Sequence, residues 1–439
     1  MNYEKELFDL LDKGKKFLTR QSLKERKKKL MIFTVGEENI KNATKFKNRG
    51  KRIEKDLINK LRNKKFFLYG AGGAGVLFYK NFCEKYSLFP ELIVDKLENW
   101  DENKLCFLGK VGKEKLLKAS ENLSKIPKNW IAIITVNKKF FQREIENMLQ
   151  KSGFKEILLL PEELILWYYG KTCKLTWKEF YNNTYKYFAS PKILNNFLLK
   201  GKELKKVLKS LEDEESKKVF VDVIKSFVFL QNIKTIMYPV EEQYFPRELS
   251  LDYNHFVDIG SWKGDTLIAL HKFVGHVDTI YCFEPNTDCL TTLMEVINMH
   301  YNVANRILIF PLGVYSKKKI LYLKKDFLGR GISKIFLDNK FLDSNSSESI
   351  YCLPLDTIFV KEKITFIKMD IEGAELEALK GARRIIKEQK PDLAICIYHH
   401  PDHFWQIPLF LKELVPEYKL YIRKYGPQFL TETVLYATI

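Results

Sequence analysis

The sequence predicts an α/β protein with two mainly parallel sheets, each covered by helices on both faces, joined by a mainly helical segment. Short apolar stretches alternate with helix-like stretches over residues 63–165. The same alternation returns at His255 and continues to Ile439. Strands that alternate with helices are typical of sheets in which each helix crosses back to start a parallel neighbour. Residues 166–250, between the two units, look mostly helical.

This pattern divides the chain into four parts: a basic helical N-terminal segment (1–62), a first α/β domain (63–165), a helical linker region (166–250) and a second α/β domain (251–439). The chain has 439 residues, of which 46% are hydrophobic, enough for more than one globular core. No apolar stretch approaches the about 20 residues that a membrane-spanning helix needs. The first residues contain no apolar leader, and the seven cysteines are scattered without a CxxC pair. We therefore expect a cytoplasmic protein.

The net charge of +19 is concentrated near the start of the chain. The first 65 residues hold 21 lysines and arginines but only 9 acidic residues, with the densest run at Lys24–Lys29. One interpretation is a solvated helical face, and another is a surface that contacts an anionic membrane or an acidic partner. No interleaved aromatic motif for stacking RNA bases is present, so we expect no nucleic-acid partner. The oligomeric state stays open.

The first α/β domain begins with the expected strand Phe66–Tyr69, followed by Gly70-Ala71-Gly72-Gly73-Ala74-Gly75. This is a complete GxGxxG, and Asp95 ends the next expected strand. The arrangement is that of a Rossmann-like dinucleotide site with its ribose-binding acid. However, residues 63–165 contain no Tyr-x-x-x-Lys with a nearby serine, as a dehydrogenase or epimerase would need. A nucleotide or nucleotide-sugar site at Gly70, Gly72, Gly75 and Asp95, an NAD site, and a domain that serves only packing all remain open.

The second α/β domain can be followed strand by strand to its end. Seven strands are expected, over residues 255–260, 279–283, 307–310, 364–369, 393–397, 418–423 and 433–437. Helices are expected from residue 265 and over 374–390 and 404–415. The last two strands should close the sheet as an antiparallel pair.

The strand Val257–Ile259 runs into a glycine turn, Gly260–Gly264, and then into a helix. Glycines without a Cβ let the backbone approach a ligand closely, and ligands of doubly wound sheets bind at the carboxyl ends of the strands. The positive end of the next helix favours a carboxylate, and Asp258 can pair with an ammonium. S-adenosylmethionine carries both groups.

Glu284 ends the next strand, where its carboxylate can accept hydrogen bonds from two ribose hydroxyls. NAD and S-adenosylmethionine sites both have such an acid. The spacing Gly260-x-x-x-Gly264 is not GxGxxG, so the two signals together predict an adenosyl cofactor of the methyl-donor type.

Further candidate residues follow the fourth and fifth strands. Asp370, on the same edge as Asp258 and Glu284, would hold the substrate or the methionine ammonium. Helix capping is the alternative, stronger for Glu375 than for Asp370. His399 and His400 offer a base for deprotonating a hydroxyl. Neighbouring strand residues point to opposite faces, so only one of them should face the pocket. Structural hydrogen bonding is an alternative, as is a metal site with Asp370 or Glu372 as a further ligand. The predicted catalytic set is Asp370, His399 and His400, with no metal assigned.

Residues 241–439 resemble the FkbM-type methyltransferase family. The matching stretches are Glu241–Phe245, Val257–Thr266, Phe283–Pro285, Lys368–Glu375, Leu379–Ala382, Ile397–Asp402 and Glu432–Ala437. The resemblance implies the seven-stranded sheet of a class I methyltransferase and methylation of a hydroxyl, often on sugars of surface glycans or on secondary metabolites. It implies cofactor binding by Asp258, Gly260, Gly264 and Glu284. The full expected cofactor set adds Ser261, Asp265, Thr266, Pro285 and Gly313.

The sequence thus predicts an S-adenosylmethionine-dependent O-methyltransferase that acts on a sugar hydroxyl of a surface glycan or of a nucleotide-linked sugar. One alternative is an NAD-dependent sugar oxidoreductase or epimerase-like activity of the first α/β domain. Another is a non-catalytic binding protein. A nucleic-acid methyltransferase is disfavoured, because no Asn-Pro-Pro-Tyr-type motif is present to hold a flipped base.

Overall fold

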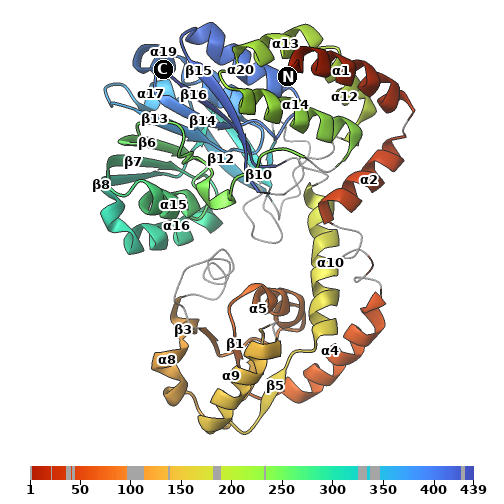
Figure 1. The fold of residues 1–439 in the computed structure, drawn as a ribbon. Coiled ribbons are helices and arrows are strands. Elements are labelled where there is room, and N and C mark those ends of the chain that lie inside the picture. Colours follow the sequence, from red (N-terminus) through yellow and green to blue (C-terminus); the bar gives the residue numbers. More distant parts are fainter. Residues whose placement is uncertain are drawn as a thin grey trace. The chain divides into compact units, whose positions relative to one another are not determined.

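The computed structural model describes residues 2–20, 22–35, 41, 45–95, 113–136, 139–180, 189–231, 234–324, 334–336, 347–426 and 431–439. The chain forms two compact units (Figure 1). The smaller unit contains residues 35–179, and the larger unit contains residues 1–34 and 180–439. Over the described ranges, no helix is long and apolar enough to cross a membrane. The four-part division of the sequence stays a prediction.

The smaller unit is built on a five-stranded, all-parallel sheet of order β3-β2-β1-β4-β5. The strands are β1 (Phe66–Tyr69), β2 (Leu92–Asp95), β3 (Leu116–Lys118), β4 (Ile131–Ile134) and β5 (Ile157–Leu159). Its helices are α4 (Lys47–Leu61), α5 (Gly73–Phe78), α6 (Glu84–Tyr86), α8 (Ala119–Asn122), α9 (Lys139–Lys151) and α10 (Glu162–Phe180), with single turns η1 (Tyr79–Cys83), η2 (Lys113–Lys115) and η3 (Leu123–Lys125). The side chains of β1 and β4 are buried, as expected for central strands of a parallel sheet.

The larger unit contains a seven-stranded sheet of order β15-β16-β14-β13-β6-β7-β8. The strands are β6 (His255–Ile259), β7 (Val277–Phe283), β8 (Ala304–Phe310), β13 (Phe366–Met369), β14 (Asp392–Cys396), β15 (Lys419–Lys424) and β16 (Thr433–Thr438). β16 runs antiparallel to both of its neighbours, while the pairs from β14 to β8 are parallel. The predicted α/β fold, including the closing antiparallel pair, is confirmed.

Helices cover both faces of this sheet: Figure 1 shows α15 (Asp265–Phe273) and α16 (Thr287–Met299) on one side, and α17 (Leu355–Ile358), α19 (Arg383–Gln389) and α20 (His403–Leu414) on the other. The single helix expected over 374–390 is wrong, since α18 (Glu375–Lys380) and α19 are separate. A Cβ at Gly381 would lie 2.2 Å from the carbonyl oxygen of Tyr315, so the chain turns there against neighbouring backbone. Asp356 then caps α19 by accepting the backbone N–H groups of Arg384 and Ile385 at 2.8 and 3.0 Å.

A second sheet of four strands, which the sequence analysis did not predict, lies in the chain between β8 and β13. Its order is β11-β10-β12-β9, with β9 (Gly313–Val314), β10 (Lys319–Lys324), β11 (Lys334–Phe336) and β12 (Ser347–Leu353). Tyr315, Leu321, Ile350 and Cys352 form its small core. Gly313 lies in β9, where a Cβ would be 2.6 Å from the sulfur of Cys352. This predicted cofactor residue therefore has a packing role in the small sheet.

The larger unit also contains helices from both sides of the smaller one in sequence: α1 (Tyr3–Thr19), α2 (Leu23–Val35), α12 (Pro191–Leu198), α13 (Gly201–Ser210) and α14 (Glu214–Phe229), with turns η5 (Val240–Glu242) and η6 (Tyr301–Val303). α1 packs against α12, α13 and α14, and α14 packs against β15.

Part of the basic run Lys24–Lys29 is structural. Arg26 is fully buried and donates to the carbonyl oxygens of Phe227 and Val228 at 3.4 and 3.3 Å, and Lys29 donates to that of Phe229 at 3.1 Å. These carbonyls lie at the C-terminal end of α14, where cations complement the helix dipole. Burial lowers the pKa of Arg26 to about 10. The anionic-membrane partner therefore stays a prediction that rests on the other basic residues.

Candidate functional site

The expected cofactor loop follows β6 and requires its glycines for the protein's own packing. Gly260 has φ +87°, and a Cβ there would lie 2.1 Å from the carbonyl oxygen of Asp370. Gly264 has φ +88°, and a Cβ there would lie 2.8 Å from Cγ1 of Val296. Left-handed backbone and these close approaches both exclude other residues. The loop is thereby fixed against the turn that follows β13, which brings Asp258 and Asp370 to the same sheet edge.

Asp258 forms a buried ion pair that sequence analysis missed. Nζ of Lys368 lies 2.9 Å from Oδ1 of Asp258 and donates to the carbonyl oxygen of Gly260 at 2.6 Å. Burial opposes the charged form of Lys368, but the carboxylates of Asp258 and Asp370 outweigh it and raise its pKa above the usual value. The only signal in the sequence is a lysine inside an otherwise apolar strand, at the position that pairs with Asp258 in the parallel register.

Three buried polar atoms around this loop have no hydrogen-bond partner among the described residues: Oδ2 of Asp258, Nε1 of Trp262 and Oγ1 of Thr266. Buried polar groups of native proteins almost always have partners, so such a group needs an explanation. One carboxylate oxygen, one indole N–H and one hydroxyl around a single loop are suited to a polar ligand. Asp265 is exposed in the first turn of α15, next to Thr266.

Glu284 follows β7 and lies against the same loop. Its Oε2 accepts the backbone N–H of Trp262 and its Oε1 that of Asn286, both at 2.8 Å. Burial raises the pKa of Glu284 to about 7, although these two hydrogen bonds favour the ionised form. Pro285 follows it, and Ser261 donates from its hydroxyl to the carbonyl oxygen of Asp258 at 2.9 Å. Asp258, Ser261 and Glu284 thus lie at one edge of the sheet, and their use by a cofactor stays a prediction.

Two tyrosines that the sequence analysis did not single out hold Asp370. The hydroxyl of Tyr244 donates to Oδ2 of Asp370 at 2.8 Å, and that of Tyr398 lies 3.4 Å from Oδ1. Burial raises the pKa of both phenols well above the usual value, so both remain donors. Tyr244 lies in the stretch Glu241–Phe245 quoted for the family resemblance, and Tyr398 precedes His399.

The structure turns His399 toward Asp370. Nδ1 of His399 lies 2.7 Å from Oε1 of the fully buried Glu375, which also accepts the backbone N–H groups of Ile371 and Gly373. Nε2 lies 3.4 Å from Oδ1 of Asp370 and 3.7 Å from Oε2 of Glu372. His399 therefore stands between one buried carboxylate and two partly exposed ones.

His400 makes a different contact, since its Nδ1 accepts the backbone N–H of Asp402 at 3.1 Å. The third histidine of this stretch, His403, is buried with its Nδ1 3.4 Å from Oε2 of Glu375, and burial lowers its pKa to about 4. Of the three candidates for the catalytic set, the structure thus brings Asp370 and His399 together and places His400 in a local turn.

The electrostatics around His399 are strongly coupled. Burial would lower its pKa, but the carboxylates of Glu375, Glu372 and Asp370 raise it to about 10. Burial would raise the pKa of Glu375, but His399 lowers it to about 2. Glu372 has its pKa raised to about 7, first by burial. An imidazole with such a pKa already holds its proton at neutral pH, so this arrangement favours a binding or positioning role for His399 over that of a free base.

The expected site of the smaller unit has its glycines in place. Gly70 has φ +119°, and a Cβ at Gly75 would lie 2.2 Å from the carbonyl oxygen of Gly70, so the turn packs on itself. A Cβ at Gly72 would meet nothing within 4 Å. Asp95 accepts the backbone N–H of Ala71 at 2.5 Å, which ties the acid to the loop. Nucleotide binding by this glycine loop and Asp95 stays a prediction.

Part of the larger unit matches a known protein family. Residues 258–429 match the family model described as the methyltransferase FkbM domain. Residues 258–429 therefore form an FkbM-type methyltransferase domain. A crystal structure of a methyltransferase FkbM from Methylobacillus flagellatus KT aligns with 92% of this chain and 99% of its own, at 19% identity and a TM-score of 0.47. No curated protein sequence gives a significant match.

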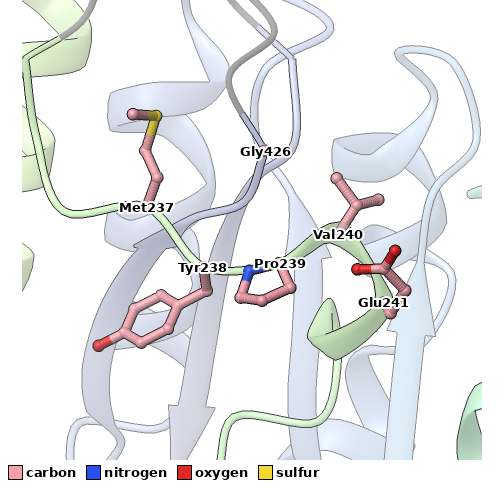
Figure 2. A pocket seen from close by; sticks show the side chains of 6 residues that line it. All are labelled: Met237, Tyr238, Pro239, Val240, Glu241 and Gly426. Carbon is pink, nitrogen blue, oxygen red and sulfur yellow. The ribbon is translucent and has the colours of Figure 1, made fainter.

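The larger unit has a surface cavity of about 440 Å³ beside the end of β15, lined by Met237, Tyr238, Pro239, Val240, Glu241 and Gly426. Figure 2 shows the side chains of Met237 and Val240 on the same side of this segment. Backbone hydrogen bonds from Tyr238 to Lys424 and from Gly426 to Tyr238 hold the segment along β15. None of the predicted cofactor or catalytic residues lines this cavity, although Glu241 begins the stretch Glu241–Phe245 quoted for the family resemblance.

Proposed function

We propose that the FkbM domain transfers the methyl group of S-adenosylmethionine to a sugar hydroxyl of a surface glycan or of a nucleotide-linked sugar. The observation that carries the proposal is the buried carboxylate of Asp258, whose Oδ2 has no partner among the described residues although it lies at the ligand-binding edge of the sheet. Glu284 follows the adjacent strand at the same edge.

The residues of this edge suit the cofactor's groups. Asp258 would hold the ammonium, and the first turn of α15 would face the carboxylate. Glu284 would hold the ribose hydroxyls, because an ionised carboxylate has about four acceptor positions and two backbone N–H groups use only part of them. The hydroxyl of Thr266 and the indole N–H of Trp262 supply further contacts.

Bound S-adenosylmethionine would supply a methyl group activated by its positive sulfur, and the protein's part is to align the acceptor. The side chain of Asp370 is 25% exposed and lies on the same edge, so it can accept a hydrogen bond from an acceptor hydroxyl while the two tyrosines hold it in place. Glu372 and Glu432 lie nearby, and both have their pKa raised to about 7 by burial and by neighbouring carboxylates. A cluster of acceptors of this kind suits a molecule with several hydroxyl groups.

Calorimetry with S-adenosylmethionine tests the proposal on the full chain. We expect the wild type to bind, and Asp258→Asn and Glu284→Gln each to weaken binding at least tenfold. Asp278→Asn is a matched control, because Asp278 lies in β7 but is exposed and bonded to Thr279 and Asn305. Thermal melting of each variant separates lost binding from lost folding, above all for Asp258→Asn, which leaves the buried Lys368 without its charged partner.

NAD and UDP-sugars are titrated in parallel. Binding of NAD alone, abolished by Gly72→Val, would assign the working site to the smaller unit and overturn the proposal. Gly72→Val is a clean probe, because a side chain there meets open space and the residue has an ordinary φ of −74°. Transfer of a labelled methyl group from S-adenosylmethionine to purified glycan or UDP-sugars then tests the acceptor class.

A further inference from the structure

We propose that Asp370, Glu372 and His399 bind a divalent metal ion of the Mn²⁺ or Zn²⁺ type at the edge of the large sheet. The three residues meet because β13 and β14 are parallel neighbours, with Met369 paired to Ile395. Asp370 and Glu372 follow β13, and His399 follows β14. Glu372 has φ +57° and Gly373 φ +104°. This left-handed turn is uncommon for a glutamate and points to a constraint at this position.

The separations between His399 and the two carboxylates are close to those of ligands that share an ion. Nε2 of His399 lies 3.4 Å from Oδ1 of Asp370 and 3.7 Å from Oε2 of Glu372, long for direct hydrogen bonds. Two ligand atoms bound at about 2.1 Å to one ion are roughly 3.0–3.5 Å apart for octahedral to tetrahedral angles. The separation between His399 and Asp370 falls in this range, and the carboxylate of Glu372 would have to move slightly closer to His399. The carboxylates of Asp370 and Glu372 are 25% and 27% exposed, so an ion can reach them and keep further positions open to solvent or substrate.

Glu375 orients the imidazole. Ligand atoms of Asp370, Glu375 and His399 all lie within 4.8 Å of one another, so Glu375 is a geometric alternative to Glu372 as third ligand. However, Glu375 is fully buried, and its Oε1 already faces Nδ1 of His399 and two backbone N–H groups. Nδ1 therefore carries a proton toward Glu375, and an ion that binds Nε2 must displace the proton that Nε2 carries in the metal-free protein. A carboxylate behind a ligating histidine is the usual support of a metal site.

The negative charge around His399 also favours a bound cation. The carboxylates of Asp370, Glu372 and Glu375 face the imidazole of His399, and that of Glu432 interacts electrostatically with Asp370 and His399. Of the nearby lysines, Lys368 is paired with Asp258, and Lys424 donates to the carbonyl oxygens of Tyr425 and Gly426. A divalent cation would balance this excess of negative charge. A mixed set of one nitrogen and two oxygen ligands favours Mn²⁺ or Zn²⁺ over Ca²⁺.

The role of the ion rests on the proposed function: bound to an acceptor hydroxyl, it would lower the pKa of that hydroxyl and position its oxygen for methyl transfer. Binding of the ion itself does not depend on that function.

The test titrates the chelator-treated full chain with Mn²⁺ and follows the electron paramagnetic resonance signal of the free ion. We expect one bound ion per chain in the wild type, and at least tenfold weaker binding in Asp370→Asn and His399→Gln. Glu375→Gln should weaken binding about 10–100-fold as a supporting residue. His400→Gln is the matched control, because His400 lies next in the chain and faces Asp402 instead.

Three outcomes would overturn the proposal: no loss of free Mn²⁺ at millimolar metal, unchanged binding in both ligand variants, or an equal effect of the His400 control. Calorimetry with S-adenosylmethionine on the same samples separates the two proposals. If Mn²⁺ binds and S-adenosylmethionine does not, the metal site is supported and the proposed function is rejected. If S-adenosylmethionine binds and Mn²⁺ does not, the proposed function is supported and the metal site is rejected. Thermal melting of each variant identifies losses that come from unfolding.

Discussion

Lys368 of β13 and Asp258 of β6 form an ion pair of 2.9 Å that is almost completely buried. It joins the strand that leads to Asp370 to the strand that leads to the cofactor loop. Lys368 also donates to the carbonyl oxygen of Gly260, so one lysine fixes both turns.

Breaking this pair should destabilise the FkbM domain. Lys368→Met would leave the buried carboxylate of Asp258 without its partner, which costs about 3–5 kcal/mol. The double variant Asp258→Leu with Lys368→Met should recover most of that loss, since it removes both charges. Denaturant unfolding of the single and double variants measures the coupling, and additive losses would contradict it.

An alanine should destabilise the loop that contains Gly260 much more than the loop that contains Gly72. Gly260→Ala places a Cβ 2.1 Å from the backbone of Asp370 at φ +87°, and we expect a loss of more than about 3 kcal/mol or no soluble protein. Gly72→Ala has open space, and its stability should stay within about 0.5 kcal/mol of the wild type. Thermal melts of the two variants compare them, and similar losses would show that the loops are not packed as described.

Stability should depend on pH through Glu284. Its folded-state pKa of about 7 lies above the unfolded value of 4.5, so the folded state binds the proton more tightly. Between about pH 4.5 and 7 its ionisation costs stability as pH rises, by an amount on the order of 3 kcal/mol. Glu284→Gln should remove this slope. Urea unfolding at several pH values checks it, and parallel curves for wild type and variant would refute it.

The affinity for S-adenosylmethionine should also depend on the ionisation of Glu284, but it should increase as pH rises. Ribose hydroxyls donate to the ionised carboxylate, so binding of S-adenosylmethionine should tighten as pH rises from 6 to 8. Titration of the cofactor's own groups affects the wild type and Glu284→Gln alike. The variant lacks the carboxyl group, so its affinity for S-adenosylmethionine should change less with pH than that of the wild type. Calorimetry at three pH values compares them, and an equal pH dependence would argue against ribose binding by Glu284.

Arg26 should matter for stability more than its basic neighbours. Arg26→Met removes two hydrogen bonds to the last carbonyls of α14, and we expect a loss of about 1–3 kcal/mol. Lys28 lies two residues later and is exposed, so Lys28→Met should have an effect below about 0.5 kcal/mol. Chemical unfolding of the two variants tests this, and equal effects would mean that the cap does not stabilise α14.

Most of the large sheet was predictable, because its strands are short apolar runs bounded by Gly, Pro or Asp. The four-stranded sheet of β9–β12 was not predicted, since β10 and β12 carry several polar or charged residues and the core of this sheet consists of only a few side chains. The break between α18 and α19 was missed for another reason. It depends on Gly381 meeting Tyr315 and on a cap from Asp356, both distant in sequence.

The sequence by itself determined which chemical groups stand at the sheet edge. Asp258 lies near the end of β6, and Glu284, Asp370 and His399 follow β7, β13 and β14, which are neighbouring parallel strands whose carboxyl ends meet at one edge. Only the tertiary structure decided their partners. Strand register pairs Asp258 with Lys368, and the turn after β13 places Glu375 behind His399 rather than His400. Contacts between strands more than 100 residues apart depend on register and side-chain direction, which local sequence patterns do not encode.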